Sequence, residues 1–175
     1  MILMKIYNQL RYNIPVFIVS FITAFLPDNR FSIRIRGYLF SKFIKNCGKN
    51  FQVGRDVTLL NTNNLSIGDN VYIAKGVWMN CKGNIEIEDE VLIAPYVTIS
   101  SMQHTIKDNS YRFSNSLSGK VLIKKGSWIA SHTSIKQGVT IGSGCLVAAN
   151  SAVIKDVANN TIVGGVPAKF IKNNK

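Results

Sequence analysis

The feature that most constrains this chain is an aliphatic residue at every sixth position of residues 127–157. The residues at these positions are Ile129, Ile135, Ile141, Val147 and Val153. A helix repeats every 3.6 residues and a strand every two, so a period of six suits neither a helix nor one long half-buried strand. The period is typical of a coil of short strands and turns, in which each unit points one aliphatic side chain into a shared core.

The six-residue step extends over most of the chain from residue 51 onward. It is kept by Ile67, Ile73 and Met79, slips by two residues, resumes at Ile87, Ile93 and Ile99, and after an interruption begins again at Ile123. A second series, offset by four, consists of Ser127, Thr133, Val139, Cys145, Ser151 and Val157. Small residues such as Gly144, Ala149 and Ser151 let the chain bend at corners. Because each coil is too small to bury itself, the coils must stack, and we predict an all-β solenoid.

Residues 1–50 have a different pattern and are predicted to be helical. Ile35, Leu39 and Phe43 step by four, which is typical of a helix with one apolar face. Basic residues surround them, namely Arg34, Arg36, Lys42 and Lys45. Residues 27–29 (Pro-Asp-Asn) interrupt this region and Gly48 ends it. We therefore expect an N-terminal helical region, 1–50, and a solenoid domain, 51–175, with a loop at about 101–120 and a short C-terminal tail.

The charge of the chain is strongly basic and unevenly distributed. Lys and Arg number 21 and Asp and Glu number 9, which gives a net charge of +12. Residues 1–50 contain eight of the cations and a single acid, Asp28, so +7 of the total lies in the helical region. A basic balance favours anionic partners, such as nucleic acid, a phosphorylated ligand or an anionic membrane. No nucleic-acid-binding motif accompanies the charge, so we expect no nucleic-acid partner.

Residues 14–26 form the one long apolar run. Thirteen residues are too few to cross a bilayer core, which needs about 20. A signal peptide is disfavoured because the residues that follow, Pro-Asp-Asn, do not form a small-residue cleavage pattern. We therefore expect a cytoplasmic protein.

The three cysteines, Cys47, Cys81 and Cys145, are odd in number and widely spaced, which disfavours a disulfide framework or a zinc ribbon. A reducing compartment suits them best. Cys145 occupies a small-residue position of its hexapeptide, so packing explains it, and Cys81 has no patterned partner. We expect neither of these two to act as a nucleophile.

The repeats resemble those of the hexapeptide-repeat acyltransferases over roughly residues 53–172. Two stretches carry the resemblance: the run GSWIASHTSIKQGVTIGSGCLVAANSAVIKDV, and the ending VGGVPAKFIK, which is similar to that of the acetyl-CoA-dependent sugar O-acetyltransferases. The resemblance implies a left-handed parallel β-helix with three faces, in which three hexapeptides make one coil. It also implies an O-acetyltransferase that uses acetyl-CoA as co-substrate and a saccharide hydroxyl as acceptor, in cell-surface polysaccharide biosynthesis.

The six-residue step fails between Ile99 and Ile123, where a polar stretch is predicted to leave the β-helix as a loop. Ordered loops of this length in a compact scaffold are commonly functional. The loop opens with His104, one of two histidines in the chain. This position matches the catalytic histidine of the sugar acetyltransferases, so the resemblance implies that His104 is the catalytic base. His132 lies inside a regular hexapeptide, and we expect it to be a surface side chain.

The chemistry of acyl transfer requires a group such as His104. A sugar hydroxyl is a poor nucleophile, whereas a thioester carbonyl is already activated, so the missing component is a base that works near neutral pH. Backbone N–H groups or an amide side chain would stabilise the oxyanion that forms. Asn80 resembles an asparagine near the acceptor in related enzymes, although its spacing to the histidine is shorter here. The alternative is that Asn80 satisfies a turn.

The resemblance also implies a coenzyme A site. Its positions are Ser131 beside the thiol end, Ala149, Ile154 and Lys155 along the pantetheine arm, and Lys169 near the phosphate head. The chain departs from the family where Ala130 and Asn150 replace a frequent glycine and where Ile154 replaces a frequent threonine. The added bulk would narrow the groove. For both lysines the alternative is a solvated surface side chain.

A metal site is disfavoured, because the carbonic-anhydrase branch of this fold binds zinc with three histidines and this chain has two. Two other functions stay open. One is N-acetylation of a nucleotide amino sugar, or O-acetylation of serine, by an enzyme of the same fold. The other is a β-solenoid binding module without catalysis, against which His104 and the VPAKF ending argue.

Proteins of this resemblance form trimers with coenzyme A between neighbouring subunits, which implies a cyclic homotrimer with three equivalent sites. Residues 1–48 are either a helical cap on the β-helix, with its cations solvated, or a surface that lies against anionic lipid. We expect most of the apolar surface of residues 14–26 to pack against its own β-helix or a neighbouring subunit, with the cations left to contact an anionic membrane.

Overall fold

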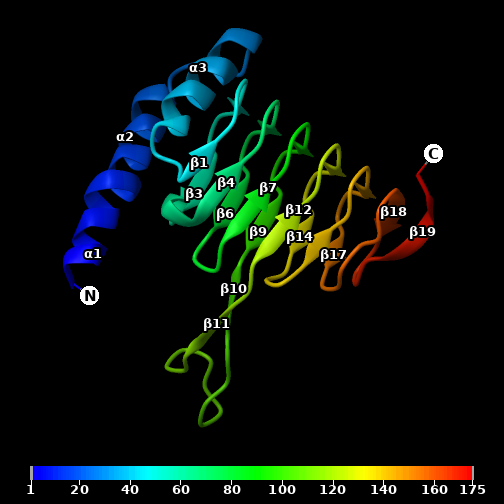
Figure 1. Cartoon of the computed structure of the whole chain (residues 1–175). Helices are drawn as coiled ribbons and strands as arrows, with labels where there is room; N and C mark the ends of the chain where they lie inside the picture. Colours follow the sequence, from blue (N-terminus) through cyan, green and yellow to red (C-terminus); the bar gives the residue numbers. More distant parts are fainter. Residues whose placement is uncertain (1, 175) are drawn as a thin grey trace.

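The computed structural model describes residues 2–174 and consists of N-terminal helices followed by a parallel β-solenoid (Figure 1). The helical region contains α1 (Ile2–Asn8), the π-helical turn η1 (Gln9–Asn13), α2 (Ile14–Thr23) and α3 (Arg30–Ser41). The helices lie at one end of the solenoid, and the chain then winds away from them to the C-terminus at the other end (Figure 1).

The solenoid has three parallel faces, which we name sheets A, B and C. Sheet A contains β1 (Asn46–Cys47), β4 (Leu65–Ile67), β7 (Ile85–Ile87), β12 (Val121–Ile123) and β15 (Thr140–Ile141). Sheet B contains β2 (Gln52–Val53), β5 (Tyr72–Ile73), β8 (Leu92–Ile93), β13 (Trp128–Ile129), β16 (Leu146–Val147), β18 (Thr161–Gly164) and β19 (Lys169–Asn173). Sheet C contains β3 (Thr58–Leu60), β6 (Trp78–Asn80), β9 (Thr98–Ser100), β14 (Ser134–Ile135) and β17 (Ala152–Val153).

The left-handed parallel β-helix predicted from the six-residue step is confirmed. The aliphatic residues of the main series point inward and are buried, as are the small residues of the second series. Ser127 shows why a polar residue fits the second series, because its hydroxyl donates to the carbonyl oxygen of Gly142 at 2.7 Å and accepts from the backbone N–H of Cys145 at 3.0 Å. A buried polar group that is satisfied in this way avoids the cost of desolvation.

The two-residue slip in the sequence has a structural cause. Asn46 pairs with Ser66, 20 residues later, whereas Leu122 pairs with Thr140, 18 residues later. The early coils are therefore two residues longer than three hexapeptides. The extra residues lie in the turn between sheets C and A, where the short 3-10 helix η2 (Thr62–Asn64) also forms.

We name the three turn columns by the sheets they connect: the first corner joins A to B, the second joins B to C, and the third joins C to A. The turns stack through backbone hydrogen bonds, as at the second corner, where the N–H of Asn150 donates to the carbonyl oxygen of Ser131 at 3.0 Å. His132 and Asn150 each have a positive φ there, of 59° and 57°. Asparagine and histidine adopt this conformation more readily than most residues.

The loop at residues 101–120 leaves the third corner as a hairpin. Its strands β10 (Met102–His104) and β11 (Ser116–Ser118) pair in antiparallel register. The hairpin projects away from the solenoid (Figure 1). Two boundaries differ from the sequence-based expectation. Pairing begins at β1, five residues before residue 51, and the C-terminal tail forms β19, which pairs antiparallel with β18.

Helix α3 closes the first coil and is held there by an arginine. Arg36 is buried, and its guanidinium donates to the carboxylate of Asp28 at 2.7 Å and to the carbonyl oxygen of Leu26 at 2.6 Å. This corrects the expectation that the cations of a helical cap would all be solvated. At Gly37 a Cβ atom would overlap the carbonyl oxygen of Phe51, so only glycine allows α3 to approach the coil this closely.

Most of the apolar surface of α1 and α2 is exposed. Helix α2 buries Val16, Val19 and Thr23 on one face, and no residue of α1 is buried. The exposed residues are Ile2, Leu3, Met4, Ile6, Tyr7, Leu10, Ile14, Phe17, Ile18, Phe21, Ile22 and Phe25, which together we call the apolar arm. The expected packing against the chain's own β-helix therefore holds for one face of α2 only. Within residues 2–174 no helix is both long and apolar enough to span a bilayer.

Candidate active site

His104 lies at the end of strand β10, where the hairpin leaves the third corner, and its side chain is exposed. It is directly opposed to Ser116 of β11, and opposed residues of an antiparallel pair point to the same face. The hydroxyl of Ser116 accepts a hydrogen bond from the ammonium group of Lys82 at 3.2 Å. A cation from the turn of the preceding coil thus lies on the face of the hairpin that carries His104.

Asn80 ends strand β6 and lies at the same corner, because it pairs in register with Ser100, the last residue of β9. Its side-chain oxygen accepts hydrogen bonds from the side chain of Asn61 at 3.0 Å and from the N–H of Lys82 at 3.2 Å. The amide nitrogen of Asn80 has no acceptor among the described residues. The oxygen is therefore already occupied, and the group that Asn80 offers to a ligand is an N–H donor.

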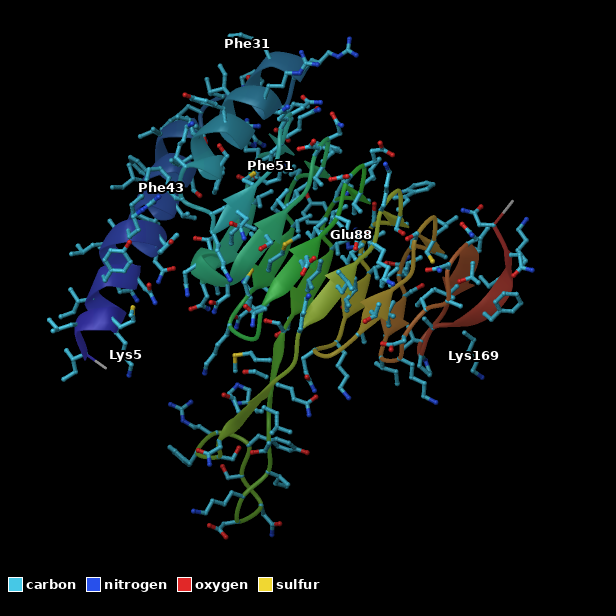
Figure 2. The ribbon with its side chains drawn as sticks, in the orientation of Figure 1. Lys5, Phe31, Phe43, Phe51, Glu88 and Lys169 are labelled. Atoms are coloured by element: carbon cyan, nitrogen blue, oxygen red, sulfur yellow. The ribbon has the colours of Figure 1, made fainter. Side chains whose placement is uncertain are left out.

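The predicted coenzyme A residues fall into two groups. Ser131 and Ala149 are stacked at the second corner, and Lys169 begins β19 opposite Gly164, at the end of sheet B that leads to the same corner. Figure 2 shows Lys169 at the end of the solenoid opposite the helices that carry Lys5 and Phe31. Ile154 and Lys155 follow β17 and lie exposed at the third corner.

The two corners are separated by the width of sheet C. Five residues of extended chain lie between Ser131 and Lys136, which begins the turn at the third corner, and they span about 16 Å. The outer face of sheet C between the corners carries the small side chains of Thr98, Ser134 and Ala152. Within one chain, Ser131 and Ala149 therefore do not share a corner with His104 and Asn80.

The cysteines are unsuited to nucleophilic chemistry. Burial raises the pKa of the Cys81 thiol to about 12. Burial and the nearby Asp69 carboxylate raise the pKa of Cys47 to about 11. Thiols with such pKa values carry almost no thiolate at neutral pH. Cys145 is buried in the second inward series. Among residues 2–174, no group of three or more His, Cys, Asp or Glu side chains could hold a metal ion.

Sequence reasoning missed Asn61 and Lys82 as members of the site. Asn61 lies one coil below Asn80, and the expected coil length of 18 residues does not align positions 61 and 80. The 20-residue coils bring them together, and the recurring two-residue slip was the sequence feature from which that alignment could have been found.

Comparisons with known proteins give the same class of protein as the fold. No protein-family model matches the chain. The galactoside O-acetyltransferase of Escherichia coli K12 is 32% identical over 137 residues, which cover 78% of this chain and 68% of that enzyme. WbbJ of the same organism, provisionally assigned as a lipopolysaccharide biosynthesis O-acetyltransferase, is 28% identical over 155 residues, covering 80% of this chain and 77% of WbbJ.

Among solved structures, the hexapeptide-repeat acetyltransferase VCA0836 of Vibrio cholerae, determined with acetyl-CoA, superimposes with a TM-score of 0.81. It is 27% identical, and the match covers 92% of this chain and 86% of that one. A left-handed β-helix that projects a histidine-bearing hairpin from one corner defines an acyltransferase. The chain belongs to the hexapeptide-repeat acetyltransferases.

Proposed function

We propose that this protein transfers the acetyl group of acetyl-CoA to a hydroxyl of a saccharide in the biosynthesis of a cell-surface polysaccharide. The observation that carries the proposal is the similarity to the galactoside O-acetyltransferase over 78% of the chain. Coenzyme A and the saccharide enter the proposal from the relatives. The roles of individual residues are argued below from their positions.

His104 is the general base of the proposed reaction. It takes the proton of the acceptor hydroxyl as the oxygen attacks the thioester carbonyl, and it then returns that proton to the leaving thiolate of coenzyme A. Its exposure at the foot of the hairpin supports this role, because the imidazole must reach two substrates. General base catalysis contributes about 10²- to 10⁴-fold to the rate, and positioning of both substrates supplies the remainder.

Asn80 is the proposed acceptor-binding residue. Because its side-chain oxygen is already bonded to Asn61 and Lys82, it faces the site as a donor. A donor there suits a sugar oxygen or the oxyanion that forms during attack. The Lys82 ammonium group, on the hairpin face of His104, adds a positive charge that favours the same anion.

Coenzyme A is proposed to lie along the second corner. The stacked turns of Ser131 and Ala149 supply backbone groups for the pantetheine arm, and Lys169 supplies a cation for the phosphate head. Ile154 and Lys155 lie at the third corner, on the side of the acceptor, so the arm contacts them only if it crosses sheet C. The exposed Lys169 side chain and the small side chains on sheet C support this path.

The active unit is proposed to be a cyclic homotrimer with three equivalent sites. The support is that one chain keeps its histidine and its coenzyme A column at different corners, about 16 Å apart. In a cyclic trimer the third corner of one subunit can face the second corner of the next, and each interface then assembles one site. Analytical ultracentrifugation tests this, and a fully active monomer would exclude it.

The N-terminal region is proposed to hold the enzyme on the inner face of an anionic membrane. The apolar arm contains Lys5 and Arg11, and no acidic residue precedes Asp28. Exposed apolar patches of this extent mark interaction surfaces. Basic residues near an anionic surface contribute about 1 kcal/mol each, and three arms in a trimer act together.

The experiment that tests the function measures release of free thiol from acetyl-CoA in the presence of an acceptor panel. The panel contains saccharides, nucleotide amino sugars and serine. We expect thiol release with saccharides, accompanied by an O-acetyl ester in the product. Release only with an amino acceptor would convert the proposal to N-acetylation. The absence of acceptor-dependent release would favour a binding module.

A further inference from the structure

A groove of about 720 Å³ runs between helix α2 and strand β3 of the first coil. Val16, Phe17 and Phe21 line it from α2, and Val57 and Leu60 line it from the solenoid. Its volume lies within the range of small-molecule sites, which is about 300–1,000 Å³. Neither His104 nor any of the proposed coenzyme A residues lines it.

The two ends of the groove are polar. Turn η1 contacts η2, so Gln9 and Asn13 lie at the end where β3 finishes in Asn61. At the other end the chain leaves α2 and reaches Asp28, whose carboxylate accepts from the backbone N–H of Arg55 at 2.8 Å. The long axis of the groove therefore follows β3 from the second corner to the third.

The middle of the groove offers an apolar surface. Two hydroxyl residues of α2 line it, but Ser20 donates to the carbonyl oxygen of Val16 at 3.0 Å and Thr23 donates to that of Val19 at 2.7 Å. Hydroxyls that bond within their own helix offer little to a ligand. A saccharide needs a dense set of free donors and acceptors, whereas a hydrocarbon chain needs only apolar contact.

The groove leads to the proposed acceptor site. Asn61 lines its end, and the side chain of Asn61 donates to Asn80 at 3.0 Å. The opposite face of α2 belongs to the apolar arm, which has basic residues and no acidic ones. A molecule held along this groove would thus lie between a surface suited to anionic lipid and the residue proposed to bind the sugar.

Building on the proposed function, we propose that this groove holds the hydrocarbon tail of the acceptor. The acceptor is then a lipid-linked saccharide, with its sugar at Asn61 and Asn80 and its tail between α2 and β3. The remainder of a longer tail continues into the bilayer on which the apolar arm rests. This arrangement would select an acceptor attached to a membrane over a free sugar.

The test compares methyl and octyl glycosides of glucose and galactose, below the critical micelle concentration, by calorimetry with the full chain in the absence of acetyl-CoA. Each methylene that leaves water strengthens binding about fourfold. We expect the octyl glycosides to bind about 100-fold more tightly than the methyl glycosides. Equal binding of the two would overturn the proposal.

A pair of matched variants locates the binding. Leu60 and Leu92 lie on outer faces of the solenoid and are 40% and 39% exposed, but only Leu60 lines the groove. Leu60→Asn should weaken octyl glycoside binding about tenfold, and Leu92→Asn should leave it unchanged. An equal effect of both variants, or a change of oligomeric state in Leu60→Asn alone, would overturn the proposal, the latter because a second copy of the chain would then fill the groove.

Transfer assays link the groove to the acceptor. For the sugar that accepts acetyl, kcat/KM should rise at least tenfold from the methyl to the octyl glycoside, and Leu60→Asn should remove that rise. Tight binding of decanoate, which has no sugar, without any gain in kcat/KM for octyl glycosides would overturn the proposal in favour of a membrane lipid. If His104-dependent transfer to free sugars persists while octyl chains bring no gain, this inference fails alone. If no acceptor is acetylated, the proposed function fails instead.

Discussion

Asn61 donates its side-chain N–H to the side-chain oxygen of Asn80 across adjacent coils, with 3.0 Å between the two atoms. The bond fixes which end of the Asn80 amide faces a ligand. It also joins the end of the apolar groove to the acceptor side of the site, so a change at Asn61 should be felt in acceptor binding.

Asn61→Gly tests this relationship. Asn61 has a φ of 60°, which glycine adopts without strain, so the variant removes the side chain and keeps the turn. We expect KM for the acceptor to rise about threefold to tenfold, the cost of one lost hydrogen bond, while KM for acetyl-CoA stays unchanged. Asn63→Ala, in the same turn but bonded to Asn64, is the control. Equal changes in both KM values would show that the turn itself had been disrupted.

His104→Ala should lower kcat by about 10²- to 10⁴-fold, because it removes the proposed base. Binding of acetyl-CoA, measured by calorimetry, should survive. His132→Ala is the control, since His132 lies exposed at the second corner with its ring stacked on Tyr96 at 5.2 Å between centroids. Near-normal turnover in a folded His104→Ala protein would rule out the mechanism.

The apolar arm should bind anionic vesicles in a flotation assay, and salt should weaken the binding because the Debye length falls below about 8 Å above physiological ionic strength. Phe25→Ser should reduce flotation, since it removes an aromatic side chain that is 83% exposed on the arm. Phe113→Ser is the matched control, with the same exposure on the hairpin loop. If the wild-type protein does not float with anionic vesicles even at low salt, the membrane role is excluded and residues 1–48 act as a structural cap.

Gly37→Ala should lower the free energy of unfolding by about 3 kcal/mol, because the added Cβ overlaps the Phe51 carbonyl oxygen and forces α3 away from the first coil. Urea denaturation followed by circular dichroism measures the effect. Gly126→Asn is the control: its φ is 69°, a Cβ there has no neighbour within 4 Å, and the change should stay within about 0.5 kcal/mol. A Gly37→Ala protein of wild-type stability would contradict the close packing of α3.

The fold could be predicted from the sequence because the step of the aliphatic residues is a direct record of the coil. Ile129 and Ile135 occupy successive faces, and each points inward because it begins or ends a turn at a fixed spacing. The hairpin could not be predicted in the same way. Its strands are three residues long, and Met102 and His104 pair with serines through backbone bonds that leave no periodic pattern in the sequence.

The roles of single side chains were harder to predict than the fold. Arg36 looks like one of several cations on a basic helix, and its burial depends on Asp28 and on carbonyl groups that meet only after the chain folds. His104 could be found because it stands where the step fails. The neighbours that orient the site, Asn61 and Lys82, come from the turns of preceding coils, and their positions depend on the length of each coil at the third corner.

The third corner takes 18, 20 or 36 residues per coil while the strands on either side keep their register, as the pairings of Leu122 with Thr140, of Ser66 with Glu86 and of Glu86 with Leu122 demonstrate. Length at this corner is thus decoupled from the integrity of the scaffold. The two other corners, one of which is proposed to hold coenzyme A, need not change when the third is exchanged. Such an enzyme can acquire a new acceptor by replacing one segment at one corner, and a chimaera that carries the hairpin of a relative would fold on the same frame with the same donor chemistry.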